Sequence, residues 1–80
     1  MARDVTVMPG RTDVLRAVQD GLMAIYQEAD LRRQQAVDDS DHGQAEAARR
    51  KIREAAGMEA AAVCLDALMA RRLPTLWPPG

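Results

Sequence analysis

The residues whose types could do chemistry are concentrated in one short run near the middle of the chain, Asp38-Asp39-Ser40-Asp41-His42. Carboxylates and an imidazole can bind a metal ion, but the run lacks the alternating oxygen ligands and the later bidentate Glu of a calcium loop. It offers zinc a single His and no nearby Cys. Ser40, Asp41 and His42 are the residue types of a hydrolytic triad, yet neighbours in a tight turn cannot form its relay geometry. We therefore interpret the run as a solvated turn, and expect no metal, no cofactor and no catalytic residue.

The rest of the chain holds little further chemistry, since it contains one Cys and one His in all. The thiol of Cys64 lies in an Ala-rich segment with no cation close in sequence that would activate it. A lone cysteine cannot form an internal disulfide, and this usage fits a reducing compartment. The chain opens without a basic and then apolar leader, so we expect no secretory signal. These features predict a non-enzymatic, cytoplasmic protein.

Composition and charge narrow the class further. The 80 residues are 48% hydrophobic, 29% charged and 2% aromatic, so Ala, Leu, Met and Val must fill a thin core. Those residue types favour packed helices over a sheet. The net charge of -1 gives no strong attraction to nucleic acid. No apolar run approaches the roughly 20 residues needed to span a bilayer. We expect a single all-α domain that does not enter the membrane.

A first helix is predicted before the turn, over 13–38. Its apolar and small residues recur at steps of three and four, which is the pattern of one helical face. Thr12 or Asp13 can cap its N-terminus through a side-chain oxygen. Carboxylates oppose the macrodipole at a helix C-terminus, so we expect this helix to stop near Asp38.

A second helix is predicted after the turn, over 43–72. Asp41 followed three residues later by Gln44 resembles a capping box at its start. Two arginines favour its C-terminal end, and Pro74 prevents much extension beyond it.

Two long helices with a short connection predict an antiparallel hairpin over 12–73, between a flexible leader at 1–11 and a flexible Pro-rich tail at 74–80. Facing residues of such a hairpin have a nearly constant sum of residue numbers, and here the apolar residues pair at sums of 83 or 84. Gly57 would face Tyr26, where it either makes room for the ring or simply weakens the helix by about 1 kcal/mol. The predicted seam pairs Leu15 with Met69, Val18 with Leu65, Leu22 with Ala62, Ile25 with Met58, Ala29 with Ala55, Arg32 with Ile52 and Ala36 with Ala48.

Further apolar residues remain at the open end of the hairpin, outside this seam. The one partner helix of the hairpin cannot cover so wide an apolar arc, so we expect a further element to cover these residues. The covering element could be a second copy, a different protein, or the leader and the Trp77 tail folded back; for Trp77 itself we favour a mobile tail. The predicted partner-binding residues are Met23, Tyr26, Ala61, Cys64 and Leu68.

The second helix also carries a family resemblance. Residues 58–68 read Met-Glu-Ala-Ala-Ala-Val-Cys-Leu-Asp-Ala-Leu, which is an apolar residue, Glu, two small residues and then an apolar ladder. This segment resembles the small two-helix co-chaperones of type III secretion needle subunits. The resemblance implies a cytoplasmic, non-enzymatic protein that pairs with a helical-repeat chaperone and helps to keep a needle subunit soluble.

Two other functions stay open at this point. A homodimeric four-helix bundle acting as a structural or regulatory adaptor would also cover the apolar residues. An RNA-binding bundle is a third alternative, because Arg49, Arg50, Lys51 and Arg53 form a basic cluster. Acidic residues are interspersed and no aromatic residue lies near for base stacking. The basic cluster therefore supports RNA binding less strongly than the apolar residues support protein binding.

Overall fold

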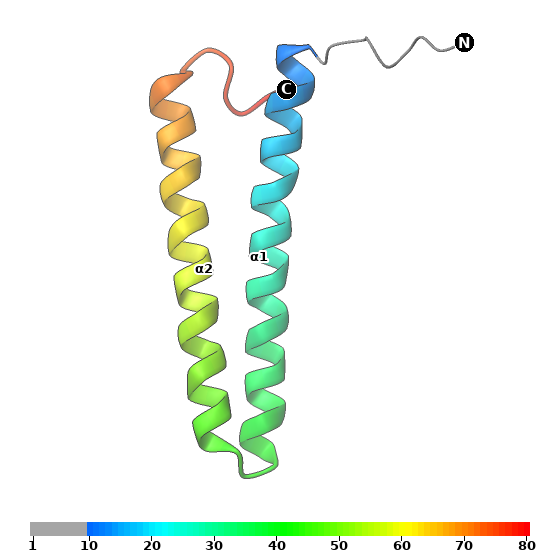
Figure 1. The fold of residues 1–80 in the computed structure, drawn as a ribbon, viewed down its shortest axis with the longest axis vertical. Coiled ribbons are helices and arrows are strands. Elements are labelled where there is room, and N and C mark those ends of the chain that lie inside the picture. Colours follow the sequence, from blue (N-terminus) through cyan, green and yellow to red (C-terminus); the bar gives the residue numbers. More distant parts are fainter. Residues whose placement is uncertain (1–9) are drawn as a thin grey trace, which may run out of the picture.

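The computed structural model describes residues 10–80, which form two long antiparallel helices (Figure 1). Helix α1 spans Arg11–Asp41 and helix α2 spans Ala45–Arg72, so the two contain 31 and 28 residues. The predicted all-α hairpin is confirmed, and no strand occurs among the described residues. Most of the predicted leader, residues 1–9, lies outside the described part of the chain.

Helix α1 begins two residues earlier than its sequence pattern predicts. Gly10 takes the N-cap position, and its backbone N–H donates to Oδ2 of Asp13 at 3.2 Å. A carboxylate in the first turn also interacts favourably with the positive end of the helix dipole. Asp13 therefore stabilises the helix start from within the first turn, and does not precede it as a cap.

The tip of the hairpin is built around Gly43, which has a φ of 75°. The N–H of Gln44 donates to the carbonyl of Asp39 at 2.8 Å, and the N–H of Gly43 donates to the carbonyl of Ser40 at 3.1 Å. These two bonds form a Schellman motif, in which a left-handed residue ends the helix. The predicted stop near Asp38 is wrong, because this cap carries α1 on to Asp41.

The predicted capping box at the start of α2 is also wrong. Asp41 is the last residue of α1, and Gln44 takes the N-cap position of α2 without a side-chain hydrogen bond. The unfavourable acidic end of α1 is offset in another way. Nζ of Lys51 on α2 lies 2.6 Å from Oδ2 of Asp39, so a cation from the opposite helix neutralises one carboxylate of that last turn.

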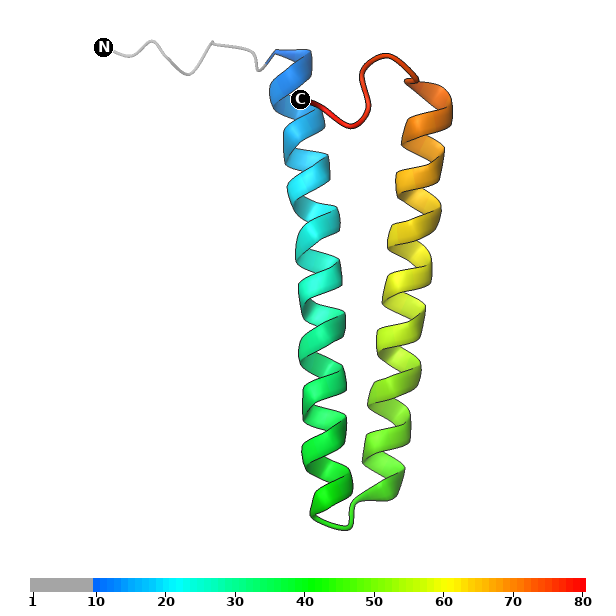
Figure 2. The same ribbon diagram turned by 180° about the vertical axis from the view of Figure 1, so that it is seen from behind.

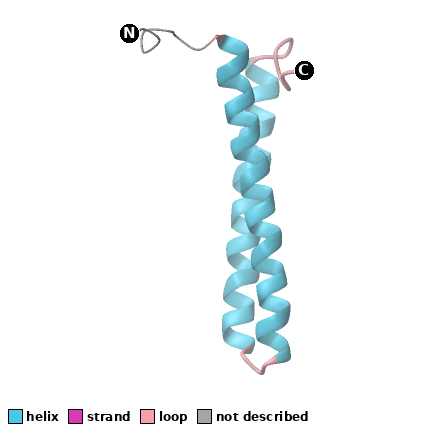
Figure 3. Cartoon of the chain, turned by 90° about the vertical axis from the view of Figure 1, so that its right-hand side faces the viewer, coloured by secondary structure: helices cyan, strands magenta, loops and turns pink. Residues whose placement is uncertain are grey.

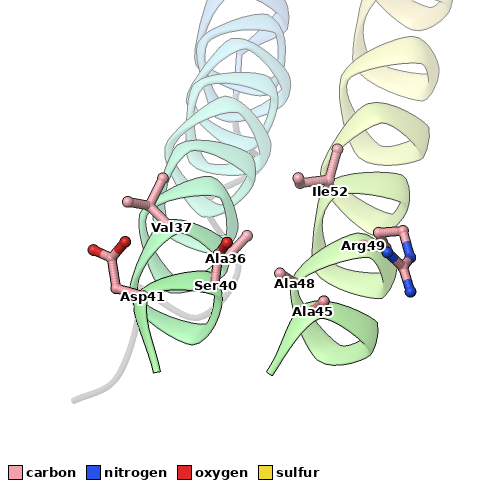
Figure 4. Close-up of a pocket in the computed structure, with 8 residues that line it drawn as sticks. All are labelled: Ala36, Val37, Ser40, Asp41, Ala45, Ala48, Arg49 and Ile52. Atoms are coloured by element: carbon pink, nitrogen blue, oxygen red, sulfur yellow. The ribbon is translucent and has the colours of Figure 1, made fainter. Parts of the chain in front are cut away.

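The seam between the helices repeats every seven residues and consists mainly of alanine. Figure 4 shows the side chains of Ala36 and Ala48 pointing toward each other across it. Alanine adds little bulk, so the two backbones can approach closely over the half of the hairpin near the tip. The buried seam residues are Leu15, Leu22, Ala29 and Ala36 on α1 and Ala48, Ala55 and Ala62 on α2.

At the open end the helices lie farther apart than at the tip (Figures 1 and 2), and the C-terminal tail folds back over one side of the pair (Figure 3). The indole of Trp77 is only 7% exposed and packs in one cluster with Leu15, Leu22 and Ala62. Its Nε1–H donates to Oδ1 of Asp66 at 2.7 Å. The structure therefore differs from the mobile tail that we favoured and takes the alternative in which Trp77 folds back. The physical reason is that a large ring fills the gap where the helices diverge, and its N–H finds an acceptor.

The predicted seam differs from the structure at three positions. Leu65 is 40% exposed and Ile52 is 51% exposed, because both lie beside the narrow alanine seam rather than within it. A Cβ added at Gly57 would meet no atom within 4 Å, so this glycine does not make room for the ring of Tyr26. Tyr26 packs against the cluster of Leu22 and Trp77 instead.

Candidate docking surfaces

The hairpin has two broad sides, which are defined by position relative to the seam. Successive residues of an α-helix turn by about 100°, so the residues three and four places after a seam residue lie on opposite sides of it. Figure 3 views the hairpin edge-on, with α1 and α2 overlapping, so that these two sides face left and right.

One side, which we call the Trp77 face, carries residues four places after the seam. Arg33 and Glu59 are two of them, and Nη1 of Arg33 donates to Oε2 of Glu59 across the helices at 2.9 Å. Asp66 is a third, and it accepts the indole hydrogen bond of Trp77. A pocket of about 310 Å³ lies beside the tail and is lined by Gln19, Leu22, Met23, Tyr26, Asp66 and Trp77, among others.

The other side carries residues three places after the seam and has no tail over it. Near the tip it is charged: the Lys51–Asp39 pair lies here, and so does the pair in which Nη1 of Arg32 lies 2.7 Å from Oε1 of Glu54. Toward the open end the charges give way to exposed apolar residues, with Val14 48%, Leu65 40% and Leu68 37% exposed. We call this half the uncovered face; it comprises Val14, Ala17, Val18, Gly21, Ala24 and Ile25 on α1 and Ala61, Cys64, Leu65 and Leu68 on α2, with Val18 and Ile25 half-buried.

The five predicted partner-binding residues do not share one surface. Met23 is 52% exposed and lies at the rim of the Trp77 pocket, and Tyr26 lies half-buried in the same pocket. Ala61, Cys64 and Leu68 are all exposed on α2, on the uncovered face. The tail therefore contacts the pocket that includes Met23 and Tyr26, whereas Ala61, Cys64 and Leu68 face solvent.

Leu65 is the residue of the uncovered face that sequence reasoning missed. It follows Ala62 by three places, and this spacing is compatible with both a seam position and a flank. The seven-residue repeat of alanines would have distinguished the two, since it identifies Ala62 as the seam position and Leu65 as its neighbour. Val14 of α1 lies on this face as well and is 48% exposed.

A shallow apolar groove of about 330 Å³ lies at the tip, on the same side as the Trp77 face (Figure 4). Val37 and Ile52 form its walls and are 63% and 51% exposed. Asp41 and Arg49 stand at its two edges and point away from each other. The groove therefore offers an apolar floor without converging polar groups.

Ion pairs join several of the charged side chains on both sides of the hairpin. The hydrogen bond from Arg33 lowers the pKa of Glu59 below its ordinary value, and the same bond raises the pKa of Arg33. In the basic cluster that could attract RNA, Lys51 pairs with Asp39 and Arg49 lies 3.6 Å from Oε1 of Glu46. These carboxylates offset part of the positive potential that a phosphate backbone would require.

Among residues 10–80, no three His, Cys, Asp or Glu side chains lie close enough together to hold a metal ion. Neither α1 nor α2 is long and apolar enough to cross a membrane. Comparison of the chain with protein-family models, curated proteins and solved structures finds no match.

Proposed function

We propose that this protein is a non-enzymatic helical interaction module, which binds helices of another protein through the uncovered face. The observation that carries the proposal is the imbalance between core and surface. Within the described residues, no large side chain is less than 2% exposed, and the most deeply buried residues are alanines such as Ala29, Ala55 and Ala62. Eight large apolar side chains, by contrast, are at least 37% exposed.

The free energy of burying apolar side chains favours a partner that covers this face. Burying a Leu or Val side chain is worth about 1.5–3 kcal/mol relative to leaving it in water. Leu65, Leu68 and Val14 gain little of this in the isolated hairpin, since each remains more than a third exposed. A helix laid along the face would bury all three at once, as a standard interface does with its central apolar residues.

The resemblance to type III secretion co-chaperones suggests one specific role of this kind. The segment that carries the resemblance, 58–68, includes the four residues that α2 contributes to the uncovered face. In this role the face would pack on a helical-repeat chaperone, while the charged tip keeps the complex with the needle subunit soluble. The setting would be the cytoplasm.

A homodimeric four-helix-bundle adaptor is the alternative, because a second copy would cover the same face. RNA binding is a weaker candidate, since the ion pairs of Arg49 and Lys51 offset part of the basic cluster.

The test is Leu68→Arg, with Val37→Arg as the matched control. Both residues are exposed, but Val37 lies at the tip, away from the uncovered face. Circular dichroism should show nearly unchanged helicity for each variant, because neither residue is part of the seam. Sedimentation velocity should show that Leu68→Arg loses association, with itself or with a co-expressed helical-repeat chaperone and needle subunit. Retention of every association by Leu68→Arg would contradict the proposal.

A further inference from the structure

The positions of one ion pair on the Trp77 face recur one heptad nearer the open end. Arg33 and Glu59 each lie four places after a seam residue, and Nη1 of Arg33 donates to Oε2 of Glu59 at 2.9 Å. The same two positions of the next heptad are held by Tyr26 and Asp66. Glu59 therefore lies opposite a guanidinium, whereas the equivalent carboxylate of Asp66 lies opposite a tyrosine.

The pocket on this face lies at that second pair. Tyr26 and Asp66 both line it, and its volume is about 310 Å³. Leu22 and Ala62, which precede these two residues by four places, pack in one buried cluster, so the helices keep the same register at this level. A volume of this size is at the lower end for ligand pockets and suits a single side chain rather than a large cofactor.

The carboxylate of Asp66 has no cationic partner within residues 10–80. Its Oδ1 accepts the indole N–H of Trp77 at 2.7 Å, and no Arg, Lys or His of these residues forms an ion pair with it. Both oxygens of a carboxylate accept hydrogen bonds, so Oδ2 can accept a further donor. Asp66 is also the only charged residue among the described ones that line the pocket, so the lining carries a negative charge.

Two aromatic side chains line the same pocket, the half-buried Tyr26 and the buried Trp77. The faces of aromatic rings attract cations, and a planar guanidinium can stack on a ring while its N–H groups donate to a carboxylate. The pocket therefore combines the two kinds of group that hold an arginine side chain, an anion and aromatic rings.

We propose that this pocket binds the guanidinium group of an arginine from another polypeptide. The bound group donates to the free oxygen of Asp66 and stacks on Tyr26, and so serves Asp66 as Arg33 serves Glu59 one heptad nearer the tip. The inference goes beyond the proposed function and does not depend on it, because the pocket and the uncovered face lie on opposite sides of the hairpin.

The first test titrates the full chain with N-acetyl-L-arginine amide at about 0.15 M salt, where charges more than about 8 Å apart are largely screened. The indole Nε1–H of Trp77, the only tryptophan of the chain, gives one signal in a ¹H–¹⁵N NMR spectrum. That signal should shift saturably with a dissociation constant in the millimolar range, as expected for a single side chain. N-acetyl-L-citrulline amide has the same shape without the charge and should cause no saturable shift. No saturable shift with the arginine amide, or equal shifts with both amides, would overturn the proposal.

The second test removes the charge of the pocket with Asp66→Asn. The amide oxygen can still accept the indole N–H of Trp77, so the tail should stay in place while the dissociation constant for the arginine amide rises by about tenfold or more. Glu46→Gln is the matched control, because it removes the same charge at an exposed position of the tip and should leave the dissociation constant unchanged. Equal binding by Asp66→Asn and wild type would contradict the assignment of Asp66.

The third test places the cation within the chain. Tyr26→Arg puts a guanidinium opposite Asp66, as Arg33 lies opposite Glu59, so the pocket is occupied and the arginine amide should no longer cause a saturable shift. Tyr26→Phe keeps the ring and should bind the amide within about twofold of the wild type. Because Tyr26→Arg leaves Asp66 and its bond to the tail unchanged, it remains decisive if Asp66→Asn detaches the tail. Wild-type affinity in Tyr26→Arg would overturn the proposal.

Discussion

At the scale of single residues, the hairpin is held in register by polar contacts on its two sides. Arg33 and Glu59 join the helices on the Trp77 face, and Arg32 and Glu54 join them on the other. These pairs are half-exposed, so each is worth little alone, but opposite pairs on the two sides restrain sliding of one helix along the other. An alanine seam offers few large side chains that would set the register otherwise.

The Arg33–Glu59 pair predicts a measurable acid dependence. The pKa of Glu59 is lowered in the folded chain, so its contribution is present above the ordinary carboxyl pKa and is lost as pH falls through the lowered value. Glu59→Gln should therefore reduce the loss of helicity on acidification in that window, measured as thermal melts by circular dichroism. Glu46→Gln, at a carboxylate that is almost fully exposed, should follow the wild-type profile. Identical acid profiles for wild type and Glu59→Gln would contradict the pairing.

The contact of Trp77 with Asp66 makes the tail observable in solution. Trp77 is the only tryptophan of the chain, so its fluorescence reports the tail alone. We expect a blue-shifted emission that acrylamide quenches weakly, because the indole is buried against Leu15 and Leu22. Asp66→Ala should increase the quenching, since the buried N–H loses its acceptor at a cost of about 1–3 kcal/mol. Emission like that of free tryptophan in the wild type would show a detached tail.

At the scale of the elements, small seam residues and a glycine turn produce the hairpin together. Gly43 adopts a left-handed conformation that reverses the chain, and the alanine seam then lets α1 and α2 pack closely from that turn onward. Close approach has a second consequence: it leaves little width between the helices. Residues beside the seam, such as Leu65 and Ile52, are therefore only partly covered.

The closeness of the helices predicts the effect of enlarging a seam residue. Ala55 is fully buried, so Ala55→Leu should force the helices apart and lower the free energy of unfolding by about 1–3 kcal/mol, although Leu is a good helix former. Urea titration followed by circular dichroism measures this change. Ala60→Leu is the control, because Ala60 is exposed and its enlargement should alter stability by less than about 0.5 kcal/mol. A neutral Ala55→Leu would show that the helices are not closely packed.

At the scale of the whole molecule, the two sides of the hairpin differ because the chain covers only one of them. The tail closes the Trp77 face, where Arg16 Nη2 also donates to the backbone oxygen of Gly80 at 3.0 Å. Nothing among residues 10–80 closes the uncovered face in the same way. The asymmetry directs an external partner to that face.

Two charge substitutions separate folding from association. Leu22 is 4% exposed in the core, so Leu22→Asp buries an unpaired charge and should unfold the chain. Leu65 is 40% exposed, so Leu65→Asp should leave the helicity of the isolated hairpin largely intact and abolish association. Circular dichroism and sedimentation velocity on both variants measure the two effects. Unfolding by Leu65→Asp would place this residue in the seam after all.

The sequence by itself determined the two helices and their antiparallel pairing. Helical periodicity and a polar turn are local signals, and the repeat from Leu15 to Ala36 matches that from Ala48 to Ala62 without further information. The sequence predicts the position of the turn correctly, but it does not predict how the first helix ends there. Gly43 was included in the second helix, whereas its positive φ identifies it as the residue that ends the first.

Only the tertiary structure decided which side of the hairpin is covered. Trp77 reaches Asp66, eleven residues earlier, because the helices diverge at the open end and leave a gap that the ring fills. That divergence results from the change from alanine to leucine along the seam, a packing effect that no local pattern encodes. The narrow seam also places Met23 and Tyr26 on one side of the hairpin and Ala61, Cys64 and Leu68 on the other. Steps of three and four residues look alike along a sequence, but they lead to opposite sides of a narrow alanine seam.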